Sequence, residues 1–205
     1  MTALRKTTIA LTSDAAPFAI RAERSSDVVA REALLDACFG ENRLNRTCQR
    51  LRDGRAPAEG LALSALVQGR LVGTVRLWHV SVGGLPALML GPLAVEDSSR
   101  KLGVGAALMD HALAAAKTRG HRVVILLGDA PYYARFGFSG EKTGELSLPG
   151  LFERDRLLGL ELSEGALDGA WGMIAATGKP VAKTSTLKTR AVRGRKALLQ
   201  ATQAA

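Results

Sequence analysis

The chain has 205 residues, of which 47% are hydrophobic, and a formal net charge of +9 at pH 7. This composition favours one hydrophobic core with extensions, and no apolar run reaches the roughly 18 residues that a membrane span needs. Residues 1–17 contain no continuous apolar stretch, so we expect a cytoplasmic protein. The cysteines Cys38 and Cys48 have neither metal-site nor disulfide-framework spacing, and we expect no bound metal.

The first half of the chain alternates apolar segments with turn residues, which predicts several strands. These predicted strands are residues 18–21, 61–68, 71–82 and 88–95. Turns that contain glycine separate the last three, so we expect those strands to pair antiparallel. Ser25 or Ser26 is expected to cap a helix that ends at Gly40, and residues 45–52 are expected to form a second, basic helical segment.

The second half of the chain contains a strand–loop–helix–strand unit. Its first strand ends near Val95, and its second strand spans residues 123–127. The residues expected on the apolar face of its helix are Val104, Leu108, Ala112 and Ala115. Such a unit builds two parallel strands joined by a right-handed crossover. With further strands expected at 146–152 and 156–162, the predicted fold class is α/β, or α+β, with one mixed sheet.

A glycine-rich turn joins the first strand of this unit to its helix. Its sequence is Arg100-Lys101-Leu102-Gly103-Val104-Gly105-Ala106. Backbone N–H groups at the start of a helix are unpaired, and glycine lets an anion approach them closely. The two cations that open the turn add positive charge. The turn is therefore a candidate phosphate site, although a lone Gly-x-Gly also fits a turn that binds nothing.

Residue types separate the known phosphate loops. A P-loop needs Gly-Lys followed by Ser or Thr, which this segment lacks. The dinucleotide fingerprint Gly-x-Gly-x-x-Gly is closer, because Asp129 follows the next strand where a ribose-binding acid could lie. Leu108, however, occupies the position of the third glycine in this fingerprint and would hinder the close packing of the helix on the strand.

Two motifs lie one helix and one strand apart in this unit. The first is Arg-x-x-Gly-x-Gly-Ala at residues 100–106, and the second is Tyr-Tyr-Ala-Arg-Phe-Gly-Phe at residues 132–138. Together they resemble the GCN5-related N-acetyltransferase (GNAT) superfamily. The stretch from Leu127 to Phe138 also resembles a bacterial branch of predicted N-acetyltransferases of the YhbS type. The resemblance covers about residues 18–162.

This resemblance implies a sheet whose parallel strands four and five splay apart, with acetyl-CoA as the cosubstrate in the wedge. The main chain of residues 102–106 would bind the pyrophosphate, and that of residues 93–95 the pantetheine arm. The cofactor-binding residues so implied are Leu93, Ala94, Val95, Arg100, Lys101, Leu102, Gly103, Val104, Gly105, Ala106 and Tyr133. Gly91-Pro92, just before this arm, is compatible with a β-bulge or with an irregular start of the strand.

The implied reaction is transfer of the acetyl group from acetyl-CoA to a primary amine by direct attack. Tyr133 would give a proton to the leaving thiolate, since a phenol with a pKa of about 10 stays protonated at neutral pH; its alternative role is packing. No general base is identified, and Glu96, Asp97 and His79 are the candidates. Asp129 is expected to be a helix N-cap.

We expect a flexible arm at 1–17, the acetyltransferase domain at 18–165, and a basic C-terminal extension at 166–205. Cations without any acid follow Val181, namely Lys183, Lys188, Arg190, Arg193, Arg195 and Lys196. A segment of this composition is expected to be partly disordered. It could contact nucleic acid by neutralising phosphates.

The expected partners are an amine acceptor, a small molecule sooner than a protein, and a second copy in a homodimer. A second hypothesis is a non-catalytic acyl-CoA-binding module whose basic tail engages nucleic acid or another anionic partner. Arg43, Arg46, Arg50 and Arg52 suggest an anionic acceptor, but a solvated basic face explains them equally. The acceptor cannot be identified from the sequence.

Overall fold

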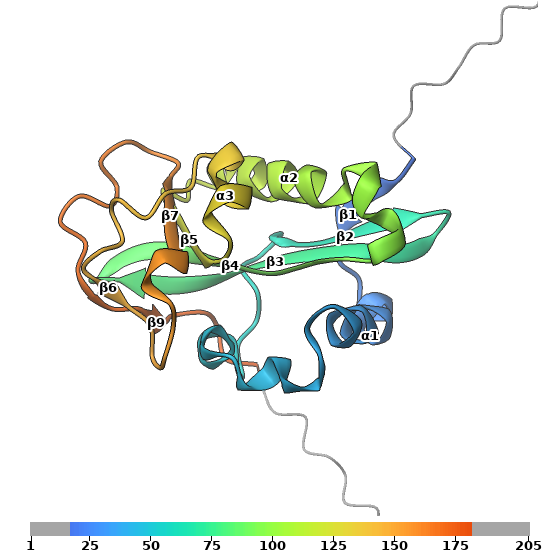
Figure 1. Cartoon of the computed structure of the whole chain (residues 1–205), viewed down its shortest axis with the longest axis horizontal. Coiled ribbons are helices and arrows are strands. Elements are labelled where there is room, and N and C mark those ends of the chain that lie inside the picture. The colour runs from blue at the N-terminus through green and yellow to red at the C-terminus, as the bar shows by residue number, and fades with distance from the viewer. Residues whose placement is uncertain (1–16, 182–205) are drawn as a thin grey trace, which may run out of the picture.

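The computed structural model describes residues 17–181, which form a sheet with helices on both faces (Figure 1). The strands are β1 (Ala19–Ala22), β2 (Ala62–Val67), β3 (Arg70–Val82), β4 (Leu85–Val95), β5 (Val123–Leu127), β6 (Leu146–Ser147), β7 (Leu157–Glu161), β8 (Gly172–Met173) and β9 (Ala175–Ala176). The α-helices are α1 (Val28–Phe39), α2 (Val104–Thr118) and α3 (Ala130–Tyr133). The 3-10 turns are η1 (Ser25–Asp27), η2 (Glu41–Asn45), η3 (Thr47–Leu51), η4 (Asp97–Leu102), η5 (Ala134–Phe136) and η6 (Arg154–Arg156). The predicted fold class, one mixed sheet with helices, is confirmed.

The main sheet has the order β1-β2-β3-β4-β5-β7, and β9 pairs with β3. All neighbours are antiparallel except β4 and β5, which run parallel. The parallel pair is short, because only Leu88 and Met89 face partners on β5. Beyond these residues β4 continues to Val95 and has β3 on one side only, within the part of the chain that the structure describes. The expected splaying of strands four and five is thus confirmed.

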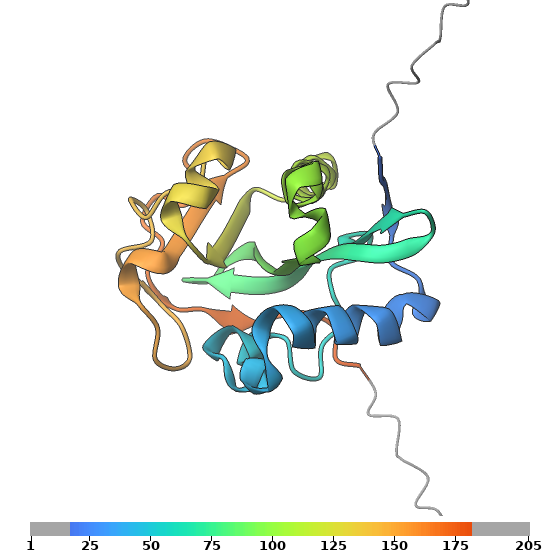
Figure 2. The ribbon, with the colours of Figure 1, turned by 45° about the vertical axis from the view of Figure 1, so that its right-hand side comes forward.

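The two faces of the sheet are covered differently. Figure 2 shows α2 on one face and α1 with η2 and η3 on the other. On α2 the buried residues Val104, Leu108 and Ala112 lie on the expected apolar face, but Ala116 is buried where Ala115 was expected. Met109 is buried as well, so the apolar face consists of a row at a spacing of four residues with one residue beside it.

The predicted bulge at Gly91-Pro92 is confirmed. Val75 pairs with Leu93 and Leu77 with Leu90, so one residue of β3 faces two of β4. Gly91 has a φ of +126°, a conformation that favours glycine. The indole N–H of Trp78 donates to the Gly91 carbonyl over 2.7 Å and fixes the bulge.

Two predicted segments differ from the structure. Residues 45–52 form no continuous helix, because the extended backbone of Arg46 separates η2 from η3. The strand expected at 146–152 is only β6, which pairs with β8 in a separate small sheet. Pro149, which has no N–H to donate, follows two residues after β6.

The packed fold extends past the expected boundary at residue 165, to Val181. Four residues beyond this boundary are buried in one hydrophobic cluster with residues of β3, β4 and β5. They are Ala166, Leu167, Ala170 and Ile174. Their β8 and β9 strands are too short to produce a recognisable period in the sequence. The expected arm, except Pro17, and the basic segment from Lys183 lie outside the described residues.

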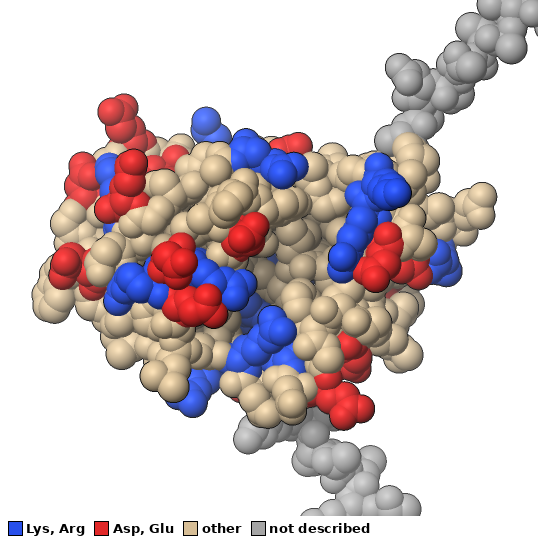
Figure 3. All heavy atoms as spheres, in the orientation of Figure 1, with Lys and Arg blue, Asp and Glu red and all other residues tan. Residues whose placement is uncertain are grey.

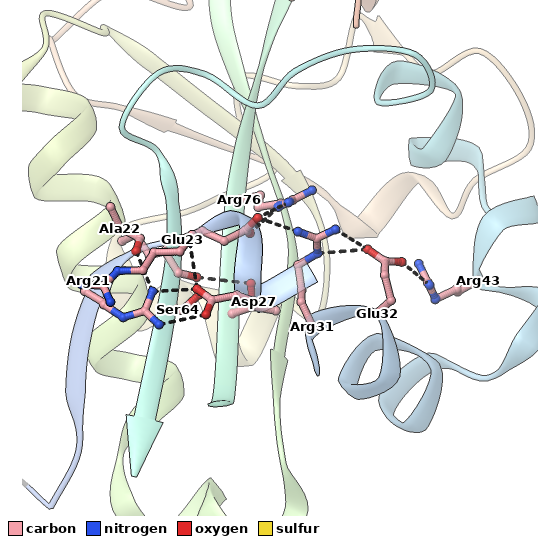
Figure 4. A network of polar contacts seen from close by, with 12 residues as sticks. Arg21, Ala22, Glu23, Asp27, Arg31, Glu32, Arg43, Ser64 and Arg76 are labelled. Atoms are coloured by element: carbon pink, nitrogen blue, oxygen red, sulfur yellow. Dashed lines mark hydrogen bonds and ion pairs between the residues drawn. The ribbon is translucent and has the colours of Figure 1, made fainter. Parts of the chain in front are cut away.

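Ion pairs fix the start of α1 against the sheet (Figure 4). Glu23 accepts from Arg31 on α1, at 2.5 Å, and from Arg76 on β3. Arg21 forms a paired contact with Asp27 at 2.6 and 2.8 Å and holds the pKa of that carboxyl below its usual range. Asp27, and not either of the expected serines, occupies the N-cap position of α1; its side chain makes no capping hydrogen bond to the helix and accepts instead from the Arg24 amide.

Candidate functional site

Two adjoining cavities run along the wedge between β4 and β5. The larger has a volume of about 880 Å³ and the smaller about 360 Å³. Phe39, Leu93 and Tyr132 border both of them. A ligand could therefore extend from the start of α2, along β4, to the turn η3.

The smaller cavity lies at the N-terminus of α2. At the start of α2 the amide of Ala107 donates to the Gly103 carbonyl over 3.0 Å. The N–H groups of residues 104–106 belong to the first turn of α2, which has no earlier turn of the same helix to accept from them. Gly103 makes this entry possible with a φ of +77°. First-turn amides at the positive end of a helix dipole form an anion site.

Most of the predicted cofactor residues gather around this smaller cavity. Those that border it are Leu93, Ala94, Val95, Arg100, Gly103, Gly105 and Ala106. Lys101 and Leu102 are exposed and border neither cavity, and the Val104 side chain is buried in the core. These last three residues could act on a ligand only through the main chain or, for Lys101, through its charge.

Tyr133 borders the larger cavity together with the Gly91 bulge. A Cβ at Gly128 would overlap the Tyr133 ring, so a glycine at the end of β5 lets the ring pack there. Burial raises the pKa of Tyr133 to about 12, which keeps its hydroxyl protonated at neutral pH. The neighbouring Tyr132 packs edge-on against it, with ring centres 4.9 Å apart.

The carboxylates of the larger cavity are Asp129 and Glu153. The candidate bases Glu96, Asp97 and His79 border neither cavity. Glu96 instead forms a bidentate pair with an exposed arginine of β3, which lowers the pKa of Glu96 to about 2. None of the three is brought to the wedge.

Asp129 occupies the N-cap position of α3, as expected, but its side chain makes no capping hydrogen bond. Its main-chain carbonyl accepts hydrogen bonds from the amides of Tyr132 and Tyr133 at the start of the helix. The carboxylate is left exposed beside the larger cavity. Its place directly after the carboxyl end of a parallel strand was the available signal for a site residue.

Four arginines border the larger cavity. They are Arg43, Arg46, Arg52 and Arg156. In Figure 3 positive side chains gather on both sides of a hollow near the middle of this face, over η2 and η3 and over η6. Arg50 is not among the lining residues and donates to the Pro149 carbonyl over 2.7 Å. The expected basic segment thus divides into arginines that face the cavity and one that does not.

The structure offers no metal site and no membrane helix within its described range. Among residues 17–181 no three His, Cys, Asp or Glu side chains lie close enough to hold a metal ion. No helix in the same range is sufficiently long and apolar to cross a membrane.

Comparison with known proteins points to one family. The model of the acetyltransferase (GNAT) family matches residues 29–138. The uncharacterized N-acetyltransferase YhbS of Escherichia coli strain K12 is 27% identical over 157 residues, which cover 76% of this chain and 93% of the relative. A crystal structure of Escherichia coli YhbS in complex with CoA has a TM-score of 0.68 and 28% identity, covering 81% of this chain and 93% of the other. A GNAT family acetyltransferase of Brucella melitensis, in complex with acetyl-CoA, has a TM-score of 0.61 and 24% identity, covering 80% and 97%.

Proposed function

Because the chain belongs to the GNAT acetyltransferase family, we propose that it transfers the acetyl group of acetyl-CoA to the primary amine of a small molecule. One observation carries the proposal. The first-turn amides of α2 at residues 104–106 and the edge of β4 that has no strand partner among residues 17–181 lie along one path that ends beside a protonated Tyr133. A diphosphate, an extended amide-bearing arm and a thioester would meet complementary groups in that order.

The residues present fit coenzyme A. The amides of residues 104–106, with Arg100, would hold the pyrophosphate, and the main chain of residues 93–95 would pair with the pantetheine arm as an added strand does. The E. coli relative was crystallised with CoA and the Brucella protein with acetyl-CoA, which supports this choice. Acetyl-CoA supplies a thioester that an amine can attack.

Tyr133 serves as the general acid in this proposal. The neutral amine nitrogen bonds to the thioester carbonyl carbon, the carbon–sulfur bond breaks, and the Tyr133 hydroxyl gives its proton to the departing sulfur. The phenolate regains a proton from water. Asp129 or Glu153, the carboxylates of the larger cavity, take the proton that the amine nitrogen loses, directly or through water.

Gly105→Val tests the cofactor site. A Cβ at this position would lie 3.1 Å from the Tyr132 hydroxyl and 3.6 Å from Val95 Cγ2, so valine would fill the smaller cavity. Calorimetry with CoA should show affinity reduced about tenfold or more, which corresponds to about 1.4 kcal/mol or more. Gly144→Val is the matched control, because Gly144 is exposed and a Cβ there meets nothing within 4 Å.

Tyr133→Phe tests the acid. Release of free thiol from acetyl-CoA in the presence of an amine panel should lose about 100-fold in kcat, with a smaller change in KM for acetyl-CoA. Tyr132→Phe removes the neighbouring hydroxyl and should cost less. CoA binding without thiol release from any amine would support the non-catalytic module in place of the enzyme.

A further inference from the structure

Arg52 is a half-buried cation that forms no ion pair with a carboxylate of residues 17–181. Within residues 17–181 its Nε is the side-chain atom that is buried without a hydrogen-bond partner, and no carboxylate oxygen lies within 4 Å of its guanidinium. The adjacent Asp53 accepts from Gln49 over 2.6 Å instead. Burial lowers the pKa of Arg52; Cys48 and Asp53 offset this only in part, and the nearby Arg46 lowers the pKa further. A buried charge left in this way is costly unless something else pairs with it.

The guanidinium of Arg52 lies at the reactive end of the groove. Arg52 follows η3 and borders the larger cavity. A Cβ at Gly91 would lie 3.2 Å from Arg52 Nη2, which places the guanidinium against the β4 bulge. This is the place where β4 and β5 have separated and where Tyr133 also borders the cavity. The free charge is therefore beside the proposed point of transfer.

Two of the other three arginines that line the larger cavity have carboxylate partners, and the third has none in the described residues. Arg43 pairs with Glu32 at 2.5 Å and with Asp36 at 2.6 Å, and Arg156 lies 3.6 Å from Glu153. Arg46 stacks over the Phe39 ring, 5.1 Å from its centre, and has no carboxylate partner in the described range. The wall near η3 thus presents two unneutralised guanidiniums, while Asp129 stands at the end of β5.

We propose that the acceptor is a small amine that carries an anionic oxygen group, a carboxylate or a phosphate, and that Arg52 binds this group. The inference rests on the proposed function and names its substrate class. A planar guanidinium donates two parallel hydrogen bonds to either group. Arg46 adds positive charge at the mouth, and the amine end of the acceptor is directed away from Arg52, toward Asp129.

The test compares acceptors that differ only in the anion. Binding to the CoA-saturated protein is measured by calorimetry for β-alanine against β-alaninamide, phenylalanine against phenylalaninamide, and phosphoethanolamine against ethanolamine. At least one anionic member should bind about tenfold to a hundredfold more tightly than its neutral partner. The amino acid and phosphate pairs tell which of the two anions is preferred.

Arg52→Gln should bring that ratio to about one, and Arg52→Lys should leave an intermediate ratio because it keeps the charge but loses the fork. Arg50→Gln is the matched control, since it removes one charge from the same turn outside the cavity and should keep the wild-type ratio. A lower melting temperature with an unchanged ratio in Arg52→Gln would show a structural role and overturn the inference.

Thiol release, measured on the same compounds, separates the two proposals. If the wild type binds no anionic compound more tightly than its neutral partner, the inference fails, and thiol release with neutral amines would leave the proposed function standing. A clear anion preference that Arg52→Gln abolishes, without thiol release from any compound, would support the Arg52 site and contradict the transferase.

Discussion

Arginines on the same side of the sheet serve two different purposes. At the start of α1, Arg31 is 7% exposed and has Glu23 at 2.5 Å, which also accepts from Arg76 (Figure 4). At the end of η3, Arg52 is buried at Nε without any such partner in the described chain. Removing one partner of a buried ion pair destabilises the fold, whereas a charge that the protein leaves unneutralised remains available to a ligand.

Removing an ion pair at the start of α1 should have the largest effect on stability. Glu23→Gln removes the carboxylate shared by Arg31 and Arg76 and should lower the free energy of unfolding by about 3 kcal/mol. This is near the lower end for a buried pair, since Arg31 keeps Glu32 as a partner. Urea denaturation measures the change.

Glu32→Gln provides the control for that variant. Its carboxylate also meets two arginines but is 40% exposed, so the loss should stay within about 1 kcal/mol. Equal losses in both variants would mean that burial does not distinguish the pairs, and the contrast between the two regions would lose its basis.

Replacing Arg52, which has no carboxylate partner in the described residues, should change the free energy of unfolding in the opposite direction. Arg52→Met keeps an apolar stem and removes the buried charge, so we expect the free energy of unfolding without ligand to rise by about 0.5–2 kcal/mol. Arg50→Met, at an exposed arginine of the same turn, should produce no such gain. A clear loss of stability in Arg52→Met alone would identify Arg52 as part of the folding network.

The pH dependence of stability tests Asp27, whose pKa is lower in the folded than in the unfolded state because of Arg21. As the pH falls, the unfolded state takes up the proton first, so the stability from Asp27 is complete above about pH 4 and is lost below it. Asp27→Asn should flatten the decline in melting temperature between about pH 5 and pH 3. Asp53→Asn, which removes an exposed carboxylate, should leave the decline as it is.

Local features of the chain were predictable because they depend on neighbouring residues. Gly103 and the apolar row beginning at Val104 indicated a turn followed by a helix, and both are present. The bulge at Gly91-Pro92 follows from backbone preferences of the same kind. The prediction of a strand over residues 146–152 was wrong beyond β6, because an apolar run alone does not distinguish a sheet strand from a packed loop.

The sequence by itself determined the order of the elements from β1 to β5 that include α1 and α2, the parallel crossover unit and the family, because these depend on motifs and on short-range geometry. Only the tertiary structure decided that residues 166–181 complete the core and that Asp129, Glu153 and Arg52 meet in one cavity. Arg52 and Gly91 are far apart in the chain, and their approach depends on how η3 packs against the β4 bulge. Whether an arginine finds a carboxylate is settled by such packing, since the same residue type is neutralised at Arg43 and left free at Arg52 within the described fold.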